Sequence, residues 1–192
     1  MAAIHEAVLD DGAEAPILVG HSIGGPLATI YAATFPCSGV ISIEAPIRLE
    51  PFAAQLQSLR PQLTGEEFAA TWARFKESWR MDLVPDDARA LLRAGEGAPQ
   101  ELVLAYQSDL LDRPLEDVVR LRDEGLERLR ERGTPYIALH ANPVDSAERA
   151  WLADRLPQAS SLVWPVRHHF PHVADPGRFA ALLTGFAAGC AR

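Results

Sequence analysis

A serine lies in a glycine-rich turn near the start of the chain, in the segment GHSIGG at residues 20–25. An apolar run precedes this segment and a helix-forming stretch follows it, which is the context expected of a G-x-S-x-G nucleophile turn. We expect glycine at positions 20 and 24 because side chains there would collide with the neighbouring elements. The amides that open the helix point at the same place, so the N–H of Ile23 is a candidate oxyanion donor. The pattern predicts that Ser22 is a catalytic nucleophile rather than part of an ordinary turn.

A serine hydroxyl needs a base within hydrogen-bond reach, and histidine is the usual one. Three histidines follow the last predicted strand, at positions 168, 169 and 172. No carboxylate or cysteine stands near them at metal-ligand spacing, so we expect no metal site. The predicted chemistry needs no cofactor. We therefore expect this loop to supply the base of a Ser-His-acid triad.

Two carboxylates compete for the third position of this triad. Glu44 ends the second apolar strand on the edge where Ser22 stands, and an acid is otherwise hard to justify there. Asp145 stands just beyond the third strand. The segment Asp145–Glu148 also has the pattern of a capping box, so the alternative role of Asp145 is only to begin a helix. On the residues alone, both carboxylates stay candidates.

Strands and helices must alternate to bring these groups together. Short apolar runs typical of buried strands are found at residues 15–20, 39–43, 135–140 and 161–166. Helical spacing predicts helices at residues 1–9, 24–35, 146–156 and 179–188. Strands separated by crossovers of this kind form a parallel sheet. The predicted fold class is therefore α/β, with a parallel sheet of about four strands.

The stretch from residue 48 to residue 132 contains helical patterns alone and interrupts the alternation. We therefore divide the chain into an α/β core, residues 1–47 and 133–192, and a helical cap inserted between strands, residues 48–132. Thr64 and Glu67 have the spacing of a capping box that begins one cap helix. The cap can fold back over the carboxyl edge of the sheet, where α/β sheets bind ligands.

Four aromatic residues share one face of that cap helix, at positions 68, 72, 75 and 79. We interpret them first as the core of the cap, because an amphipathic helix needs such a face. As a lid over the catalytic edge, the same side chains would suit an apolar or aromatic acyl group. Tyr106 would add a hydroxyl to such a lid.

The composition excludes several classes of partner. The chain has 192 residues and a formal net charge of −8, so no nucleic acid is expected as a partner. No apolar run approaches the roughly 20 residues of a membrane helix, so no membrane partner is expected. Cys37 and Cys190 are too few for a disulfide framework, and residues 1–12 do not resemble a signal peptide. We expect a cytoplasmic protein that acts on a small molecule.

The order of these motifs resembles the second half of the α/β-hydrolase superfamily. That half begins with a strand and the nucleophile turn, followed by a second strand and a helical cap. A strand with an acid after it and a strand with a histidine after it complete the order. Serine at position 22, in place of aspartate, distinguishes the chain from haloalkane dehalogenases and epoxide hydrolases. The resemblance implies acyl-transfer chemistry, as in carboxylesterases, lactonases and related C–C bond hydrolases.

The resemblance also implies roles for individual residues. The segment His169–His172 is similar to the superfamily's Gly-His-Phe-Pro-His segment, which implies that His169 is the base, although His168 replaces the usual glycine. Asp145 occupies the usual place of the acid, and on this ground we favour it over Glu44. In some members, including certain dehalogenases and cofactor-free ring-cleaving dioxygenases, the acid stands where Glu44 stands here.

The nucleophile comes unusually early in this chain. In complete members of the superfamily it follows the fifth strand, and a His-Gly loop upstream supplies a second oxyanion amide. Only about twenty residues precede Ser22, and no His-Gly pair is among them. We therefore expect the chain to be the C-terminal portion of a longer hydrolase. We also expect the strand at residues 17–19 to be an unpaired edge that invites self-association or a partner.

The sequence thus predicts a hydrolase that acts on a carboxylic ester, a lactone or a similar acyl substrate through Ser22, His169 and either Asp145 or Glu44. One alternative is a catalytically impaired homologue that serves as a binding or scaffold module. Another alternative is a cofactor-free dioxygenase-like member of the same fold.

Overall fold

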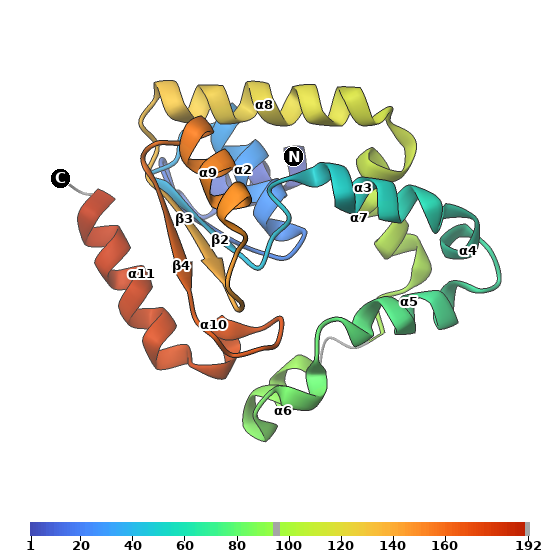
Figure 1. The fold of residues 1–192 in the computed structure, drawn as a ribbon. Coiled ribbons are helices and arrows are strands. Elements are labelled where there is room, and N and C mark those ends of the chain that lie inside the picture. The colour runs from blue at the N-terminus through green and yellow to red at the C-terminus, as the bar shows by residue number, and fades with distance from the viewer. Residues whose placement is uncertain (94–96, 191–192) are drawn as a thin grey trace.

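The computed structural model describes residues 1–93 and 97–190, in which strands alternate with helices (Figure 1). The strands are β1 (Ile17–His21), β2 (Gly39–Ile43), β3 (Tyr136–His140) and β4 (Ala159–Val163). The helices around them are α1 (Ala2–Asp10), α2 (Gly24–Thr34), α9 (Ser146–Arg155), α10 (Pro171–Ala174) and α11 (Pro176–Cys190). Between β2 and β3 run α3 (Leu49–Ser58), α4 (Arg60–Thr64), α5 (Phe68–Glu77), the 3-10 turn η1 (Met81–Leu83), α6 (Asp86–Arg93), α7 (Gln100–Asp112) and α8 (Leu115–Glu131).

Within the described residues the strands form one sheet in the order β1-β2-β3-β4, and every neighbouring pair is parallel. This confirms the predicted α/β fold class with a parallel sheet of four strands. His21 pairs with Ile43, so the last residues of β1 and β2 stand side by side. Because parallel strands all end at the same edge, the residues that follow them are brought together there.

Helices cover both faces of the sheet and bury its central strands. Val40 of β2 belongs to a cluster that includes Leu129 of α8 and Leu152 of α9. The next residue, Ile41, belongs to a second cluster against which Phe179 of α11 packs. Successive side chains of a strand point to opposite faces, which explains why neighbours enter different clusters. All of β2 is buried, as expected for a strand between two helical layers.

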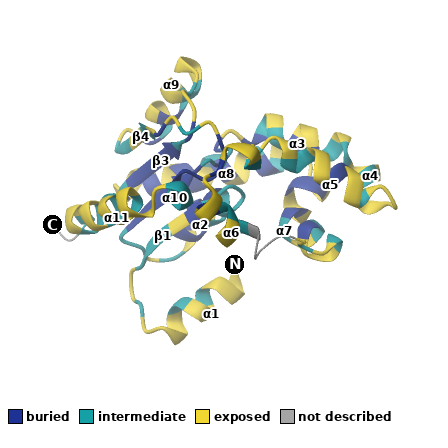
Figure 2. Ribbon diagram, turned by 90° about the horizontal axis from the view of Figure 1, so that it is seen from below, coloured by how far each residue is buried: buried dark blue, intermediate teal, exposed yellow. Residues whose placement is uncertain are grey.

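The strand β1 lies at an edge of the sheet, and among the described residues it pairs only with β2. Val19 in the middle of β1 is 45% exposed. None of the residues of α1 is buried, and Figure 2 shows this helix largely exposed. His5 of α1 forms a hydrogen bond with the Tyr31 hydroxyl of α2 at 3.0 Å, and its ring stacks on that of Phe35, directly after α2, with 3.7 Å between the ring centres. The expected edge strand is present, and self-association through it stays a prediction.

The inserted helices, α3 to α8, have a hydrophobic core of their own. Leu56, Leu63, Trp72 and Val103 are buried in it. Figure 1 shows α3, α4, α5 and α7 grouped to one side of the sheet, while α8 runs across toward the strands. The helix α8 accordingly contributes to the core of the inserted helices near its start and to the cluster on the sheet near its end.

The last strand begins and ends earlier than predicted. It spans Ala159–Val163 rather than residues 161–166. The prediction looked for a continuous apolar run, whereas β4 is an edge strand in which exposed serines at positions 160 and 161 are tolerated. After Val163 the pairing ends with the Trp164 N–H, which donates to the carbonyl of His140 at 2.8 Å. Pro165 has no N–H with which to continue it.

The capping box predicted at Thr64 is wrong. Thr64 is the last residue of α4, and its hydroxyl donates to the carbonyl oxygen of Arg60 at 2.9 Å. The next helix begins at Phe68, and its N-cap position is occupied by Glu67. A threonine hydroxyl can bond to the carbonyl four residues earlier, and this local bond competes with a capping role.

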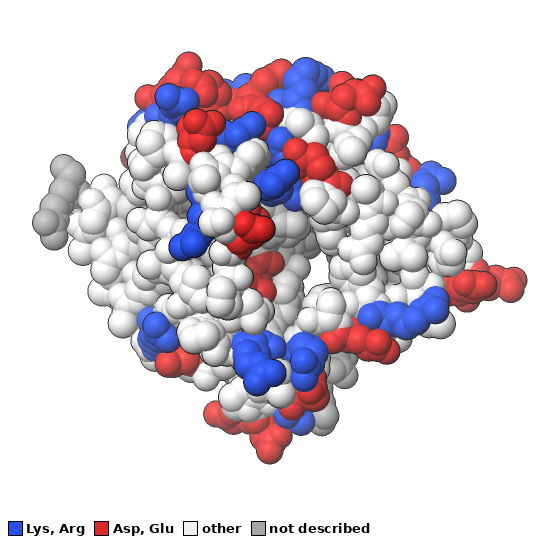
Figure 3. All heavy atoms as spheres, viewed as in Figure 1, with Lys and Arg blue, Asp and Glu red and all other residues white. Residues whose placement is uncertain are grey.

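The surface in Figure 3 mixes basic and acidic side chains and is hollowed between the sheet and the inserted helices. No described helix is long and apolar enough to cross a membrane. This hollow lies at the carboxyl edge of the strands, where α/β sheets bind ligands.

Candidate active site

Ser22 occupies the turn between β1 and α2 with a left-handed backbone, at a φ of +54°. Its N–H donates to the carbonyl oxygen of Ile43 at 2.8 Å, and its own carbonyl accepts from the N–H of Gly25 at 2.9 Å. A left-handed residue other than glycine costs on the order of 1–3 kcal/mol and persists only where its surroundings hold it. The two hydrogen bonds supply that support, so Ser22 is held at the carboxyl edge of the sheet.

Glycine is required at two positions near Ser22, and these are 20 and 25 rather than the expected 20 and 24. A Cβ at Gly20 would lie 2.1 Å from the carbonyl oxygen of Gly24, and a Cβ at Gly25 would lie 2.3 Å from the Cβ of Ala45. A Cβ at Gly24 would meet no atom within 4 Å. The expectation for position 24 is therefore wrong, because the close approach of α2 to the end of β2 falls at the following residue.

Glu44 has the same place at the end of β2 that Ser22 has at the end of β1. The two residues follow paired positions of the strands, and Glu44 is also left-handed, with a φ of +48°. Its N–H donates to the carbonyl oxygen of Leu139 at 2.8 Å, and its carboxylate accepts from the N–H of Ala141. These contacts with β3 and the residues after it hold the carboxylate at the sheet edge.

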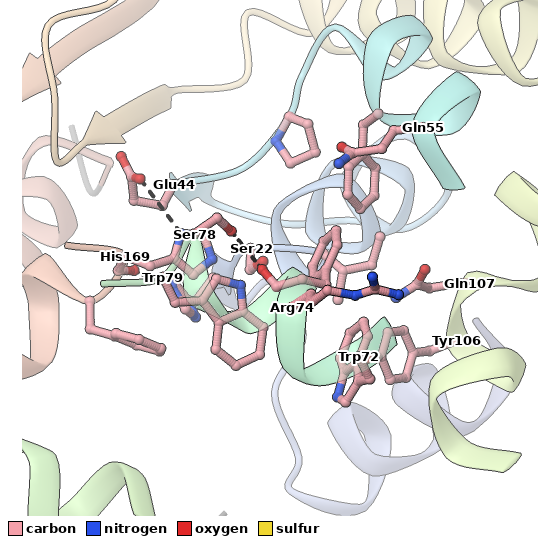
Figure 4. A pocket seen from close by; sticks show the side chains of 16 residues that line it. Ser22, Glu44, Gln55, Trp72, Arg74, Ser78, Trp79, Tyr106, Gln107 and His169 are labelled. Carbon is pink, nitrogen blue, oxygen red and sulfur yellow. Dashed lines mark hydrogen bonds and ion pairs between the residues drawn. The ribbon is translucent and has the colours of Figure 1, made fainter. Parts of the chain in front are cut away.

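His169 lies in the loop between β4 and α10. Its Nδ1 is 3.6 Å from Oε2 of Glu44 (Figure 4). The main-chain N–H of His169 donates to the carbonyl oxygen of Trp79 at 3.0 Å. The His169 and Trp79 rings stack at 13° with 5.8 Å between their centres. The Nε2 atom is buried and makes no hydrogen bond with a described residue. The imidazole thus stacks on the Trp79 ring with Nδ1 on the side of Glu44, and Nε2 is its unbonded nitrogen among the described contacts.

Asp145 lies apart from this group. It is the N-cap residue of α9, and its Oδ1 accepts from the N–H of Ala147 at 2.8 Å. Its side chain is exposed. The structure therefore shows Asp145 in the helix-capping role that was its alternative, and it brings Glu44 to His169.

The contacts of Glu44 keep its side chain charged. Burial would raise the pKa of Glu44, but the His169 imidazole beside it and the hydrogen bond from the Ala141 amide outweigh that effect and lower the pKa. Hydrogen bonds to the ionised form of a carboxyl group favour that form. Glu44 is therefore a carboxylate at neutral pH and can stabilise positive charge on His169.

His21 supports the His169 loop, a role that we did not predict from the sequence. Its Nε2 donates to the carbonyl oxygen of His169 at 2.7 Å. Burial, and then the proximity of His169, lower the pKa of His21 to about 4. His21 is therefore neutral at neutral pH and places no positive charge beside the base. Its position directly before Ser22 in the motif was the one available signal.

The other two histidines, His168 in the same loop and His172 in α10, make packing contacts. His168 is buried, and its Nδ1 accepts from the N–H of Phe170 at 3.2 Å. The ring of His172 lies 4.7 Å from that of His21 and 5.8 Å from that of Phe179, and burial lowers its pKa to about 4. Among the described residues no group of histidine, cysteine or acidic side chains is arranged to hold a metal ion.

Ser22, Glu44 and His169 line one cavity of about 590 Å³ between the sheet edge and the inserted helices (Figure 4). Ile23 lines it as well, and its N–H makes no hydrogen bond with a described residue. Much of the cavity wall is aromatic and consists of Phe52, Trp72, Phe75, Trp79, Tyr106 and Phe170. The cavity thus combines a serine, a histidine and a carboxylate with an apolar wall.

The aromatic stripe of α5 and the residues after it has both of the roles considered from the sequence. Trp72 is buried in the core of the inserted helices, and Phe68, Phe75 and Trp79 pack against that core. Trp72, Phe75 and Trp79 also line the cavity, whereas Phe68 does not. The four aromatic side chains therefore stabilise the inserted helices, and three of them, Trp72, Phe75 and Trp79, also face the candidate site.

The sequence matches the model of the Alpha/beta hydrolase family over residues 1–182. The chain therefore belongs to the alpha/beta hydrolase family, which confirms the resemblance found in its motifs. No curated protein matches the chain at a significant level.

Solved structures share this fold at low sequence identity. MenH from S. aureus superimposes with a TM-score of 0.66 at 18% identity, over 99% of this chain and 74% of that one. VinJ gives a TM-score of 0.62 at 17% identity, over 98% of this chain and 71% of that one. A thioesterase domain from the curacin biosynthetic pathway gives 0.55 at 17% identity, over 94% of this chain and 70% of that one. These likenesses show the fold.

Proposed function

We propose that this chain is a serine hydrolase that cleaves a carboxylic ester, a lactone or a similar acyl substrate. In this proposal Ser22 is the nucleophile, His169 the general base and Glu44 the acid that holds His169 in place. The N–H of Ile23 is the oxyanion donor. The inserted helices act as a cap that covers the reacting groups and supplies the apolar wall of the cavity.

The reaction begins when Ser22 Oγ attacks the carbonyl carbon of the substrate and its proton passes to Nε2 of His169. The imidazolium that forms is stabilised by the Glu44 carboxylate, which lies 3.6 Å from Nδ1. The carbonyl oxygen becomes an oxyanion at the start of α2, where the Ile23 N–H donates and the helix dipole is positive. His169 then protonates the leaving alcohol, and an acyl group stays on Ser22. A water molecule that gives its proton to His169 releases the acid and restores the serine.

Two features of the resting site fit this sequence of steps. His169 Nε2 makes no hydrogen bond with a described residue, so no competing partner must be displaced before it accepts the serine proton. Hydrogen bonds between nucleophile and base often tighten only when substrate binds. His21 stays neutral because its pKa is lowered to about 4, so it does not oppose the positive charge that develops on His169.

One observation carries the proposal. Ser22 and Glu44 follow paired positions of neighbouring strands, both are left-handed, and His169 comes from a distant loop to meet them in one cavity. Backbone strain and polar groups gathered in a cleft are typical of functional sites, since packing alone does not require them. Membership of the alpha/beta hydrolase family supports hydrolysis at the family level.

The proposal is tested by the hydrolysis of p-nitrophenyl butyrate by the wild type, Ser22→Ala and Ser78→Ala. Ser78 is a matched control, because it lines the same cavity and its hydroxyl donates only to the carbonyl of Phe75 among the described residues. We expect Ser22→Ala to lower kcat on the order of 10⁶-fold, and Ser78→Ala to leave it nearly unchanged. A loss below about tenfold in Ser22→Ala would contradict the nucleophile. Folded wild-type protein that hydrolyses no ester would favour the binding-module alternative.

A further inference from the structure

The cavity has a polar region formed by the inserted helices. Arg74 of α5, Gln55 of α3, and Tyr106 and Gln107 of α7 line it there, beside Trp72 (Figure 4). An aromatic cavity that only holds an apolar acyl group has no need of a cation and two amides. These residues come from three different inserted helices, so the polar region is a property of their tertiary arrangement.

Gln107 is the buried member of this group. It is only 3% exposed, and its Oε1 makes no hydrogen bond with a described residue. A buried polar atom without a partner costs about 1–3 kcal/mol, so native proteins rarely keep one that has no use. A rotation of the amide by half a turn presents Nε2 in place of Oε1, and Gln107 can therefore donate to a ligand or accept from it.

Arg74 supplies a positive charge without an acidic partner. Its Nη2 donates to the hydroxyl of Thr71 at a long 3.4 Å, and it forms no ion pair with a described residue. By contrast, Arg60 and Arg80 on the same group of helices are each within 3 Å of an aspartate. The acidic residue that lines the cavity is Glu44, which is already bound to His169 and the Ala141 amide. Arg74 is an exposed residue, so its guanidinium is accessible to a group that enters the cavity.

We propose that Arg74 and Gln107 form a subsite for a carboxylate of the substrate, remote from the carbonyl group that Ser22 attacks. The carboxylate pairs with the Arg74 guanidinium and accepts from the Gln107 amide, while the aromatic walls hold the apolar part between the two ends. A planar guanidinium suits a carboxylate because it donates two parallel hydrogen bonds. This inference rests on the proposed function and names its substrate class, an ester that also carries a carboxylate.

The test compares charged and neutral esters of equal length. Mono-p-nitrophenyl glutarate places the carboxylate on the acyl side, and p-nitrophenyl valerate is its neutral counterpart. The butyrate ester of 4-hydroxybenzoate places the carboxylate on the leaving group, with phenyl butyrate as its counterpart. The wild type should prefer the charged member of at least one pair, and 0.5 M salt should reduce that preference because it screens exposed charges.

The variants are Arg74→Gln, Arg74→Lys, Gln107→Leu and the control Arg60→Gln, which removes an exposed cap arginine that does not line the cavity. We expect Arg74→Gln to lower kcat/KM for the preferred charged ester about tenfold and to leave the neutral ester within a factor of about two. Arg74→Lys should restore part of the loss, and Gln107→Leu should resemble Arg74→Gln. Equal losses for charged and neutral esters, or none in either pair, would overturn the subsite.

A binding measurement separates this inference from the proposed function. Ser22→Ala cannot turn over an ester by the proposed route, so calorimetric titration with mono-p-nitrophenyl glutarate and with the 4-hydroxybenzoate ester reports binding alone. In the Ser22→Ala background, we expect Arg74→Gln to weaken the binding of at least one probe about tenfold. That result supports the subsite even if no ester is hydrolysed. Binding that is absent, or that ignores the substitution, overturns the subsite and leaves the test of Ser22 unaffected.

Discussion

The main-chain N–H of His169 donates to the carbonyl oxygen of Trp79 at 3.0 Å, and the Trp79 ring stacks on the His169 imidazole. The residue proposed as the base is thus attached to the inserted helices as well as to the sheet. On its other side, the carbonyl of His169 accepts from His21 at 2.7 Å. The loop is held by both parts of the chain, so movement of the inserted helices is expected to move His169.

Replacement of the Trp79 ring should therefore affect turnover. We expect Trp79→Ala to lower kcat about tenfold because the stacked ring orients His169. Trp79→Phe keeps an aromatic face and should stay within about threefold of the wild type. Steady-state kinetics with p-nitrophenyl butyrate check both variants, and thermal unfolding shows whether each still folds. A change confined to KM in Trp79→Ala would show that the ring binds substrate and does not position the base.

The identity of the acid is decided by two conservative substitutions. Glu44→Gln removes the charge beside His169 and should lower kcat by about 10²–10⁴-fold. Asp145→Asn should leave kcat within about twofold and stability within about 0.5 kcal/mol, because asparagine caps helices as well as aspartate does. Steady-state kinetics with p-nitrophenyl butyrate measure kcat, the first turnover measures acyl-enzyme formation, and urea unfolding measures stability. The reverse pattern would restore Asp145 as the acid.

The two glycines beside Ser22 should respond in opposite ways to alanine. A Cβ at position 20 would lie 2.1 Å from a backbone carbonyl oxygen, so Gly20→Ala should destabilise the protein by about 3 kcal/mol or prevent folding. Gly24→Ala places its methyl group in open space and should change stability by less than about 1 kcal/mol. Urea unfolding measures both. A Gly24→Ala protein as unstable as Gly20→Ala would show that the turn is packed differently.

Acidic pH should weaken the fold through His21. Its pKa is about 4 in the native state and 6.5 ordinarily, so between these values the unfolded chain binds more protons. The free energy of unfolding therefore falls as the pH falls through this window, by up to about 3 kcal/mol from this residue. His21→Gln keeps a donor for the His169 carbonyl and removes the titration. Urea unfolding near pH 7.5 and near pH 5 should show a smaller loss in the variant, and equal losses would exclude His21 as the cause.

Local patterns were sufficient to predict most of the elements. The strand β2 spans residues 39–43 as predicted, because a strand buried on both faces must be a continuous apolar run. The turn around Ser22 was also recognisable, since glycine, serine and the flanking strand and helix all lie within a few residues. The strand β4 was misplaced because an edge strand needs no such run and contains serines.

Features that depend on tertiary contacts could not be predicted in this way. The choice between Glu44 and Asp145 rests on a left-handed residue and on the Ala141 amide, which lies 97 positions away in the sequence. The contact of Trp79 with His169 uses a backbone carbonyl, which has no signature in the side chains. The division into core and cap and the self-association through β1 stay predictions.

The reaction of the protein with a fluorophosphonate tests the central claim most directly. The reagent phosphonylates a serine only where a base and an oxyanion site activate it. Intact-mass analysis and peptide mapping should find about one adduct per chain, on Ser22, with none in Ser22→Ala and slow labelling in Glu44→Gln. Folded protein that takes up no label, or a label that persists in Ser22→Ala, would contradict the account.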